Sequence, residues 1–134
     1  MERVTKYFAT DGGYPEYVGP GNLRVVGQWV TADIQVDPYS LLEVLVLVAE
    51  AQRNPKAGVE EFGGNAHYAE ISPGGVQIQN EYVEHVRGDF PLDQVADVLA
   101  DFWEYCKSVN PERTRESYVR YVAEHGHDPI PGFS

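Results

Sequence analysis

The sequence predicts an α+β fold, with a mostly antiparallel sheet of about four strands and three helices packed on it. Three observations predict this class. Runs of β-branched and aromatic residues end at Gly and Pro clusters, two helical segments begin at Asp-Pro or Asn-Pro, and the segments follow the order β-β-α-β-β-α-α. A chain of 134 residues can bury a sizeable core. We therefore expect one domain at residues 1–126 and an extended tail at residues 127–134.

The first two strands are expected in the N-terminal part of the chain. Residues 4–8 form the first strand. Residues 11–22 contain four Gly and two Pro, so we expect a loop without regular structure. Residues 23–36 are rich in Val, Ile and Trp, which favour pleated surfaces, and they predict one strand or two short ones. Gly27 within this run indicates a bulge or a close backbone approach.

Three helices are expected, and local signals mark two of their starts. Asp37-Pro38 begins the first, because Asp is a favoured N-cap and Pro a favoured first helical residue, and an apolar run continues it to residue 53. Residues 91–109 place apolar side chains on one stripe and acidic ones nearly opposite. Asn110-Pro111 begins the third helix, and Gly126 is a natural terminator.

The other two strands are predicted to form a hairpin. Residues 67–72 and 76–83 flank the turn sequence Pro-Gly-Gly at residues 73–75. From residue 76 to residue 81, one set (Val76, Ile78 and Asn80) alternates with a fully polar set (Gln77, Gln79 and Glu81). This alternation predicts a sheet with one covered side and one side facing solvent.

The charge of the chain is strongly negative and unevenly distributed. It has 21 Asp and Glu against 10 Lys and Arg, a net −11, and residues 57–106 hold ten acids but one base, Arg87. Such a field repels nucleic acid and anionic membranes and attracts basic proteins. Charge that serves only solubility is more often interspersed with Lys. We therefore predict a basic protein as partner, and neither nucleic acid nor membrane.

The helix at residues 91–109 carries Asp93, Asp97 and Asp101 at four-residue spacing. Like charges at this spacing repel by about 0.2–0.5 kcal/mol per pair, so the stripe indicates a surface kept electronegative for Lys or Arg of a partner. An ordinary solvated face is the alternative. The predicted partner-binding residues are Asp93, Asp97, Asp101, Glu104, Glu81, Glu84 and Asp89, with Tyr14, Tyr17 and Tyr82 as aromatic anchors.

Metal binding and catalysis find little support in the sequence. His125, His127 and Asp128 are close together, but no further Cys or His pair is spaced to complete a zinc site. Cys106 falls on an apolar helical stripe, where a thiol usually packs inertly. We find no nucleophile elbow and no phosphate-binding loop. We expect no metal, no cofactor and no catalysis; an enzyme with a deep polar pocket is an alternative.

The single cysteine and the N-terminus bear on location. A lone thiol fits a reducing compartment. The first residues are mixed in charge and lack the apolar core of a signal peptide. We expect a cytoplasmic protein.

Four short segments carry a resemblance: residues 25–29 (VVGQW), 63–68 (GGNAHY), 76–80 (VQIQN) and 102–105 (FWEY). Their layout, over roughly residues 23–109, resembles the small acidic bacterial proteins of the YacL type. It is also similar to immunity proteins encoded beside contact-dependent and other polymorphic toxins. The resemblance implies a protein that binds and neutralises a cognate toxin domain, often a basic nuclease. The alternative is a non-catalytic housekeeping binding or regulatory module of YacL type, which includes a homodimer.

Overall fold

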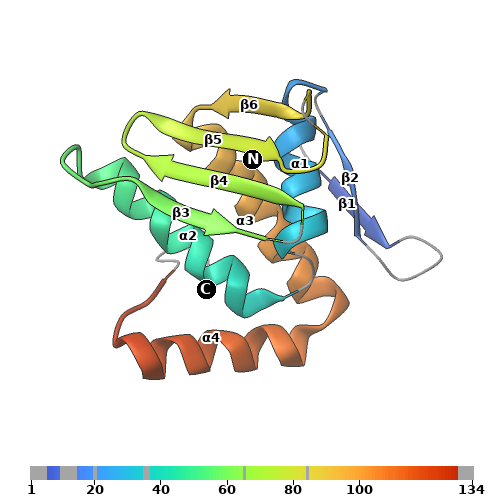
Figure 1. The fold of residues 1–134 in the computed structure, drawn as a ribbon. Helices are drawn as coiled ribbons and strands as arrows, with labels where there is room; N and C mark the ends of the chain where they lie inside the picture. The colour runs from blue at the N-terminus through green and yellow to red at the C-terminus, as the bar shows by residue number, and fades with distance from the viewer. Residues whose placement is uncertain are drawn as a thin grey trace.

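The computed structural model describes residues 6–9, 15–19, 21–34, 37–64, 66–83 and 85–129. It confirms the α+β class: a four-stranded antiparallel sheet of order β3-β4-β5-β6 lies against helices, and a separate hairpin pairs β1 with β2 (Figure 1). The elements in chain order are β1 (Lys6–Ala9), β2 (Pro15–Val18), a 3-10 turn (Gly21–Leu23), α1 (Arg24–Trp29), a π-helical turn (Val30–Ile34), α2 (Pro38–Arg53), β3 (Glu60–Gly63), β4 (His67–Ser72), β5 (Gly75–Asn80), β6 (Arg87–Phe90), α3 (Leu92–Val109) and α4 (Pro111–His125).

The predicted hairpin is confirmed as β4 and β5, and each strand of the sheet pairs with the next along the chain. Ala69, Ile71, Val76 and Ile78 are buried, whereas the residues between them are exposed or half-buried. The alternation therefore has the predicted consequence, one covered and one solvent-facing side. Gly75 closes the hairpin with φ of 133°, a conformation that favours glycine.

The three predicted helices are confirmed as α2, α3 and α4, with the expected caps. The Asp37 carboxylate accepts the Tyr39 N–H at 3.2 Å at the start of α2. The Asn110 side chain accepts the Arg113 N–H at 3.2 Å at the start of α4. Gly126 ends α4 in the left-handed conformation, with φ of 74°.

The core lies between the sheet and a layer of helices. α1, α2 and α3 pack on one face of the sheet, and α4 packs on α2 and α3, farther from the sheet (Figure 1). The largest fully buried side chains come from this layer and from the covered side of the strands; they include Trp29, Phe102, Ile34, Leu41, Leu42, Ile71 and Ile78. The opposite face of the sheet carries none of the described helices (Figure 1).

The prediction of a strand at residues 23–36 is wrong, because the described part of this segment is helical. Val26, Trp29, Val30 and Ile34 are buried, and their spacing follows the period of a helix. A short apolar run is compatible with a buried strand and with a buried helix. Burial among the other helices outweighs the modest β preference of Val and Ile.

Three strands were not predicted, so the predicted order fits only in part. β2 lies within the segment expected to be irregular, where Tyr17 pairs with Tyr7 of β1. β3 and β6 have four residues each and contain Gly and charged residues, so they lack the β-rich composition of a typical strand. β1 lies at the predicted position, within one or two residues.

Residues 127–129 form neither helix nor strand, and residues 130–134 lie outside the described part of the chain. None of the described helices combines the length and apolar character needed to cross a bilayer.

Candidate functional site

The sheet face that carries none of the described helices, the uncovered face, has a row of polar side chains across all four strands, and all but the one on β5 are acidic. Glu61 of β3 lies opposite Glu70 of β4, Glu70 opposite Gln77 of β5, and Gln77 opposite Asp89 of β6. Like charges directly opposite each other destabilise an antiparallel pair. The row therefore holds negative charge on this face at a cost in stability.

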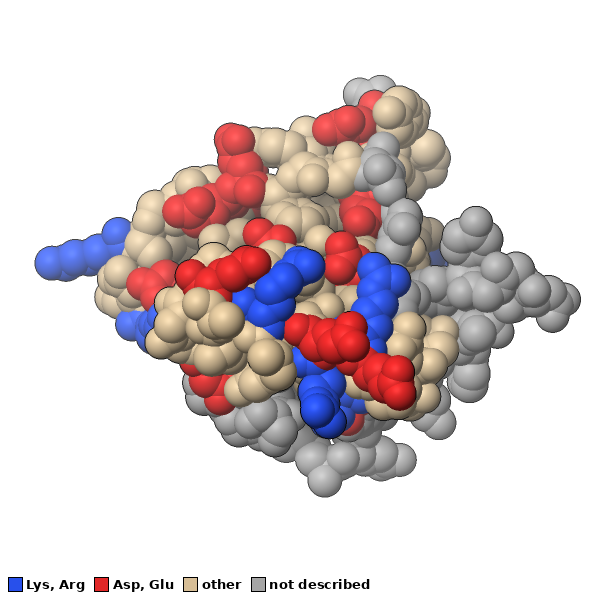
Figure 2. All heavy atoms as spheres, turned by 90° about the horizontal axis from the view of Figure 1, so that it is seen from below, with Lys and Arg blue, Asp and Glu red and all other residues tan. Residues whose placement is uncertain are grey.

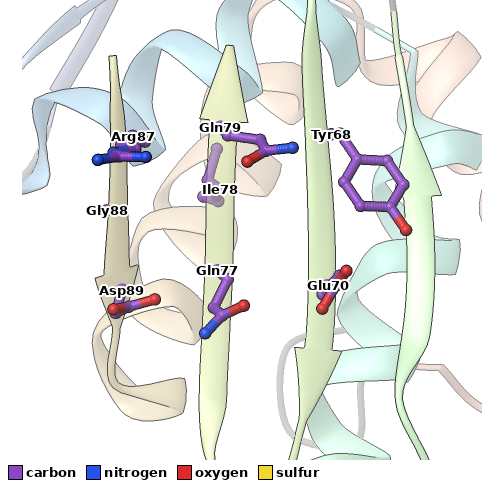
Figure 3. A pocket seen from close by; sticks show the side chains of 8 residues that line it. All are labelled: Tyr68, Glu70, Gln77, Ile78, Gln79, Arg87, Gly88 and Asp89. Carbon is purple, nitrogen blue, oxygen red and sulfur yellow. The ribbon is translucent and has the colours of Figure 1, made fainter. Parts of the chain in front are cut away.

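A second row runs beside the first and contains an aromatic residue and a base. Tyr68 of β4 lies opposite Gln79 of β5, which lies opposite Arg87 of β6 (Figure 3). The Tyr68 hydroxyl leans toward β3, and hydrogen bonds with Glu61 and then Glu70 contribute to raising the pKa of Tyr68 to about 12. A phenol that stays protonated keeps donating to carboxylates across the whole physiological range.

The two rows enclose an open hollow of about 490 Å³, lined by residues that include Tyr68, Glu70, Arg87 and Asp89 (Figure 3). A neighbouring hollow of about 680 Å³ shares Glu70 and Asp89 and extends to Pro91. Small-molecule sites are usually enclosed and mostly apolar. Both hollows are open to solvent, and the first is mostly polar, which suits side chains of a protein partner better than an enclosed ligand.

The predicted acidic stripe on α3 is present. Burial, followed by the charges of Asp101 and Asp93, raises the pKa of Asp97, so the three carboxylates are close enough to interact. Gln52 of α2 donates to the Asp93 carboxylate at 2.8 Å. Because α3 packs on the covered face of the sheet, this stripe and the uncovered face lie on different sides of the molecule (Figure 1).

The remaining predicted residues are dispersed. Glu104 on α3 forms an ion pair with Lys107 at 3.3 Å, and Asp89 belongs to the uncovered sheet face. Glu81 and Tyr82 follow β5 in the connection to β6, and Tyr82 is 78% exposed. The structure therefore does not bring the predicted residues together in one surface.

The predicted aromatic anchors have different environments. Tyr17 is half-buried, and a Cβ on Gly27 would lie within 2.6 Å of its ring, so Tyr17 packs on α1. Of the two tyrosines that the structure describes, Tyr82 has the exposure that an anchor needs. Tyr14 and Glu84 lie outside the described residues.

A buried Asp–His pair lies at one end of the sheet. The Asp33 carboxylate accepts the backbone N–H of Ala66 at 2.9 Å and that of His67 at 2.7 Å. The Nδ1 atom of His67 is 3.4 Å from Asp33 but lacks hydrogen-bond geometry, and its Nε2 lies 3.4 Å from the Asn80 amide. Both side chains are at most 3% exposed. The pair fastens the β3–β4 connection to the helical layer and offers no reactive atom to a substrate.

The histidine and cysteine considered as candidates for metal binding and catalysis have structural roles. The His125 ring stacks on Tyr121 with centroids 4.1 Å apart, beside a Tyr39 hydroxyl that donates to Glu124, so these side chains join α4 to α2. Cys106 is fully buried, and burial raises its pKa to about 12. Across the described ranges, no three His, Cys, Asp or Glu side chains are arranged to hold a metal ion.

The outer side of α4 differs from the sheet face in its charge pattern. Viewed from the side of α4, acidic and basic side chains lie next to one another (Figure 2). Its charged residues are balanced in sign: Glu112, Glu116 and Glu124 with Arg113, Arg115 and Arg120. Such a mixed surface is typical of a solvated helix and attracts neither sign strongly.

Several residues of the uncovered face were not predicted as site residues. Glu61, Tyr68 and Glu70 lie in strands whose solvent-facing positions follow from alternation, so the pattern at residues 76–81 was the available signal. Arg87 could not be placed because β6 was not predicted.

Comparison of the chain with protein-family models, with curated proteins and with solved structures found no match. The assignment of function therefore depends on the surface described above.

Proposed function

We propose that this chain is an immunity-type protein that binds and neutralises a basic toxin domain, such as a nuclease, without catalysing a reaction. The observation that carries the proposal is the uncovered sheet face, where Glu61, Glu70 and Asp89 cross the sheet in one row. The toxin identity of the partner rests on the resemblance of the sequence to immunity proteins. The basic character of the partner rests on charge.

Three properties of the sheet face favour a basic protein partner. Carboxylates in a row can accept paired hydrogen bonds from Arg, the geometry that makes Arg–carboxylate contacts strong. The Tyr68 ring beside them can stack on a guanidinium. A surface with an excess of one sign also speeds encounter with a partner of the opposite sign, and the net charge of −11 strengthens this effect.

Binding, rather than catalysis, agrees with where the reactive side chains lie. The Cys106 thiol and the Asp33–His67 pair are buried. The hollows on the sheet face are open and lack a nucleophile paired with a base. An inhibitor needs only a complementary surface, and the acidic charge of this face favours a basic partner.

The test begins with a tagged chain purified from its native host at low and high salt. We expect a basic domain that elutes at high salt and whose activity is blocked by one equivalent of this protein. Recovery of the chain without such a domain, or capture of a domain that stays fully active when bound, would contradict the proposal.

Paired charge reversals then locate the surface. Glu61→Lys with Glu70→Lys should slow association about 10–100-fold and weaken its salt dependence, because electrostatic steering is lost. Asp97→Lys with Asp101→Lys is the matched reversal on α3 and should have a smaller effect. If the α3 pair has the larger effect, the sheet face is not the contact surface.

A further inference from the structure

The β6 strand forms one edge of the four-stranded sheet, and among the described residues no backbone hydrogen bond joins its outer side. Among the described elements, β5 alone makes extensive contact with β6. Asn80 N–H donates to the Val86 carbonyl at 2.8 Å, and Ile78 lies opposite Gly88 in the same register. In an antiparallel pair, bonded positions alternate along each strand. Gly88 therefore bonds to β5, and the N–H and C=O groups of Arg87 and Asp89 face outward.

We propose that this edge pairs with β6 of a second copy of the chain, antiparallel and centred on Gly88, so that two sheets become one. In this register Arg87 lies opposite Asp89 of the partner subunit, and Asp89 opposite the partner subunit's Arg87. These residues carry the outward-facing groups, so each N–H finds a carbonyl on the other strand. The contact is two-fold symmetric and closes on itself.

The side chains of the edge match the same register. Arg87 and Asp89 both project from the uncovered face, and neither forms an ion pair with another described residue. Two-fold pairing sets each base across from an acid of the other copy, and such cross-strand pairs stabilise a sheet. The charge that each copy leaves without a partner is thus satisfied by the other.

The covered side of the β6 edge also allows the second copy of the chain to approach closely. Gly88 would lie opposite the partner subunit's Gly88 at a non-hydrogen-bonded position, where Cα atoms come within about 4.5 Å. A Cβ on Gly88 would lie 2.7 Å from the Phe90 ring, so the ring already occupies the side-chain space there. On this side, Phe90 lies opposite the partner subunit's Val86, and Val86 opposite the partner subunit's Phe90. These apolar side chains form a contact across the two-fold axis.

The opposite edge of the sheet does not share this complementarity. β3 has the sequence EEFG, with two acids and no base, so pairing with its own copy would add acid to acid. A chain of net −11 repels another copy over most of its surface. Of the two sheet edges, self-association is therefore favoured at β6, which carries both signs. The contact involves a strand of four residues, so the dimer is weak and concentration-dependent.

Charge exchange tests the pairing. Sedimentation velocity of the full chain over a range of concentrations should show a monomer–dimer equilibrium. Arg87→Asp alone, or Asp89→Arg alone, should weaken it roughly tenfold or more, because two like-charged pairs replace two ion pairs. The double exchange should restore it. Arg115→Asp and Glu116→Arg on α4 are the matched controls and should leave it unchanged.

Hydrogen exchange on the unsubstituted chain gives a second measurement. The amides of Arg87 and Asp89 should be protected at high concentration and lose protection on dilution, whereas the Gly88 amide stays protected. A monomer at every concentration, or a dimer insensitive to the single exchanges, would overturn the inference. It does not depend on the proposed function, since it needs no toxin partner.

Discussion

Tyr17 and Gly27 show how one residue without a side chain can fix the position of another element. The Tyr17 ring of β2 occupies the space above the α1 backbone at Gly27, within 2.6 Å of where a Cβ would stand. Atoms cannot approach that closely, so any larger residue must displace the ring or the helix. The contact joins the N-terminal hairpin to the helical layer.

Gly27→Ala should therefore destabilise the protein by about 1–3 kcal/mol, the usual cost of overpacking. Without the ring, the same substitution would stabilise a helix by up to about 1 kcal/mol. Urea unfolding measures the difference. Gly21→Ala is the matched control, because a Cβ there meets no atom within 4 Å and should change stability little. Equal stabilities of the two variants would contradict the contact.

Gly27 in the sequence predicts a bulge or a close backbone approach, and the surrounding segment predicts a strand, whereas the structure has a helix with a tyrosine ring against this glycine. A glycine in an apolar run indicates that a neighbouring group occupies the space of a side chain, whether the run is a strand or a helix. Val26, Trp29 and Val30 could have indicated a helix by their spacing, yet their β-branched and aromatic character favoured a strand. The choice depends on which elements bury the segment, and a local pattern does not contain that information.

Among whole elements, the starts of α2 and α4 were predictable because they are encoded locally. The side chains of Asp37 and Asn110 satisfy backbone N–H groups two or three residues away. β3 and β6 were not predictable, since four residues with Gly and charge become a strand only through pairing with a longer neighbour. A strand that forms only through pairing with another segment therefore cannot be predicted from its own residues.

The β3–β4 connection depends on Asp33, a residue more than thirty positions earlier in the chain. Its buried carboxylate accepts the N–H groups of Ala66 and His67, and Gly64 leaves room for it, since a Cβ there would lie within 2.6 Å of the carboxyl carbon. Asp33→Ala should leave both N–H groups without an acceptor and cost roughly 3 kcal/mol.

Two measurements check the Asp33 prediction. Urea unfolding gives the stability loss, and hydrogen exchange of the Ala66 and His67 amides should quicken more than that of Ile78 in the centre of β5. Glu116→Ala, an exposed substitution on α4, is the control and should change stability by less than about 0.5 kcal/mol. Unchanged exchange at both amides would show that Asp33 does not hold this connection.

For the whole molecule, composition predicted the kind of surface but not its place. The excess of acids in residues 57–106 is real, yet folding divides it between the sheet face and α3. Asp89 and Asp93 are four residues apart but belong to different elements, a strand and a helix. Only the tertiary structure shows which acidic residues lie next to one another. It adds Glu61 and Glu70 to the candidate site, because both lie in the row on the uncovered face.

Alkaline pH should destabilise the whole fold, because several described groups resist ionisation in it, three of them most strongly. Burial raises the pKa of Cys106 from 9.0, and hydrogen bonds with Glu124 and Glu61 lead the causes that raise those of Tyr39 and Tyr68 from 10.0, each to about 12. The unfolded chain releases these protons at the ordinary values. The contribution to stability is therefore complete below about pH 9 and is lost as pH rises through about 12.

Urea unfolding at about pH 8 and about pH 11 measures this loss, and the added negative charge acts in the same direction. Cys106→Ala separates the buried thiol from the tyrosines. It should lower stability at about pH 8 by leaving a small cavity, yet reduce the further loss at about pH 11, because no thiol remains to ionise in the unfolded chain. If the substituted and unsubstituted chains lose the same stability between these pH values, the Cys106 thiol is not held neutral by its burial in α3.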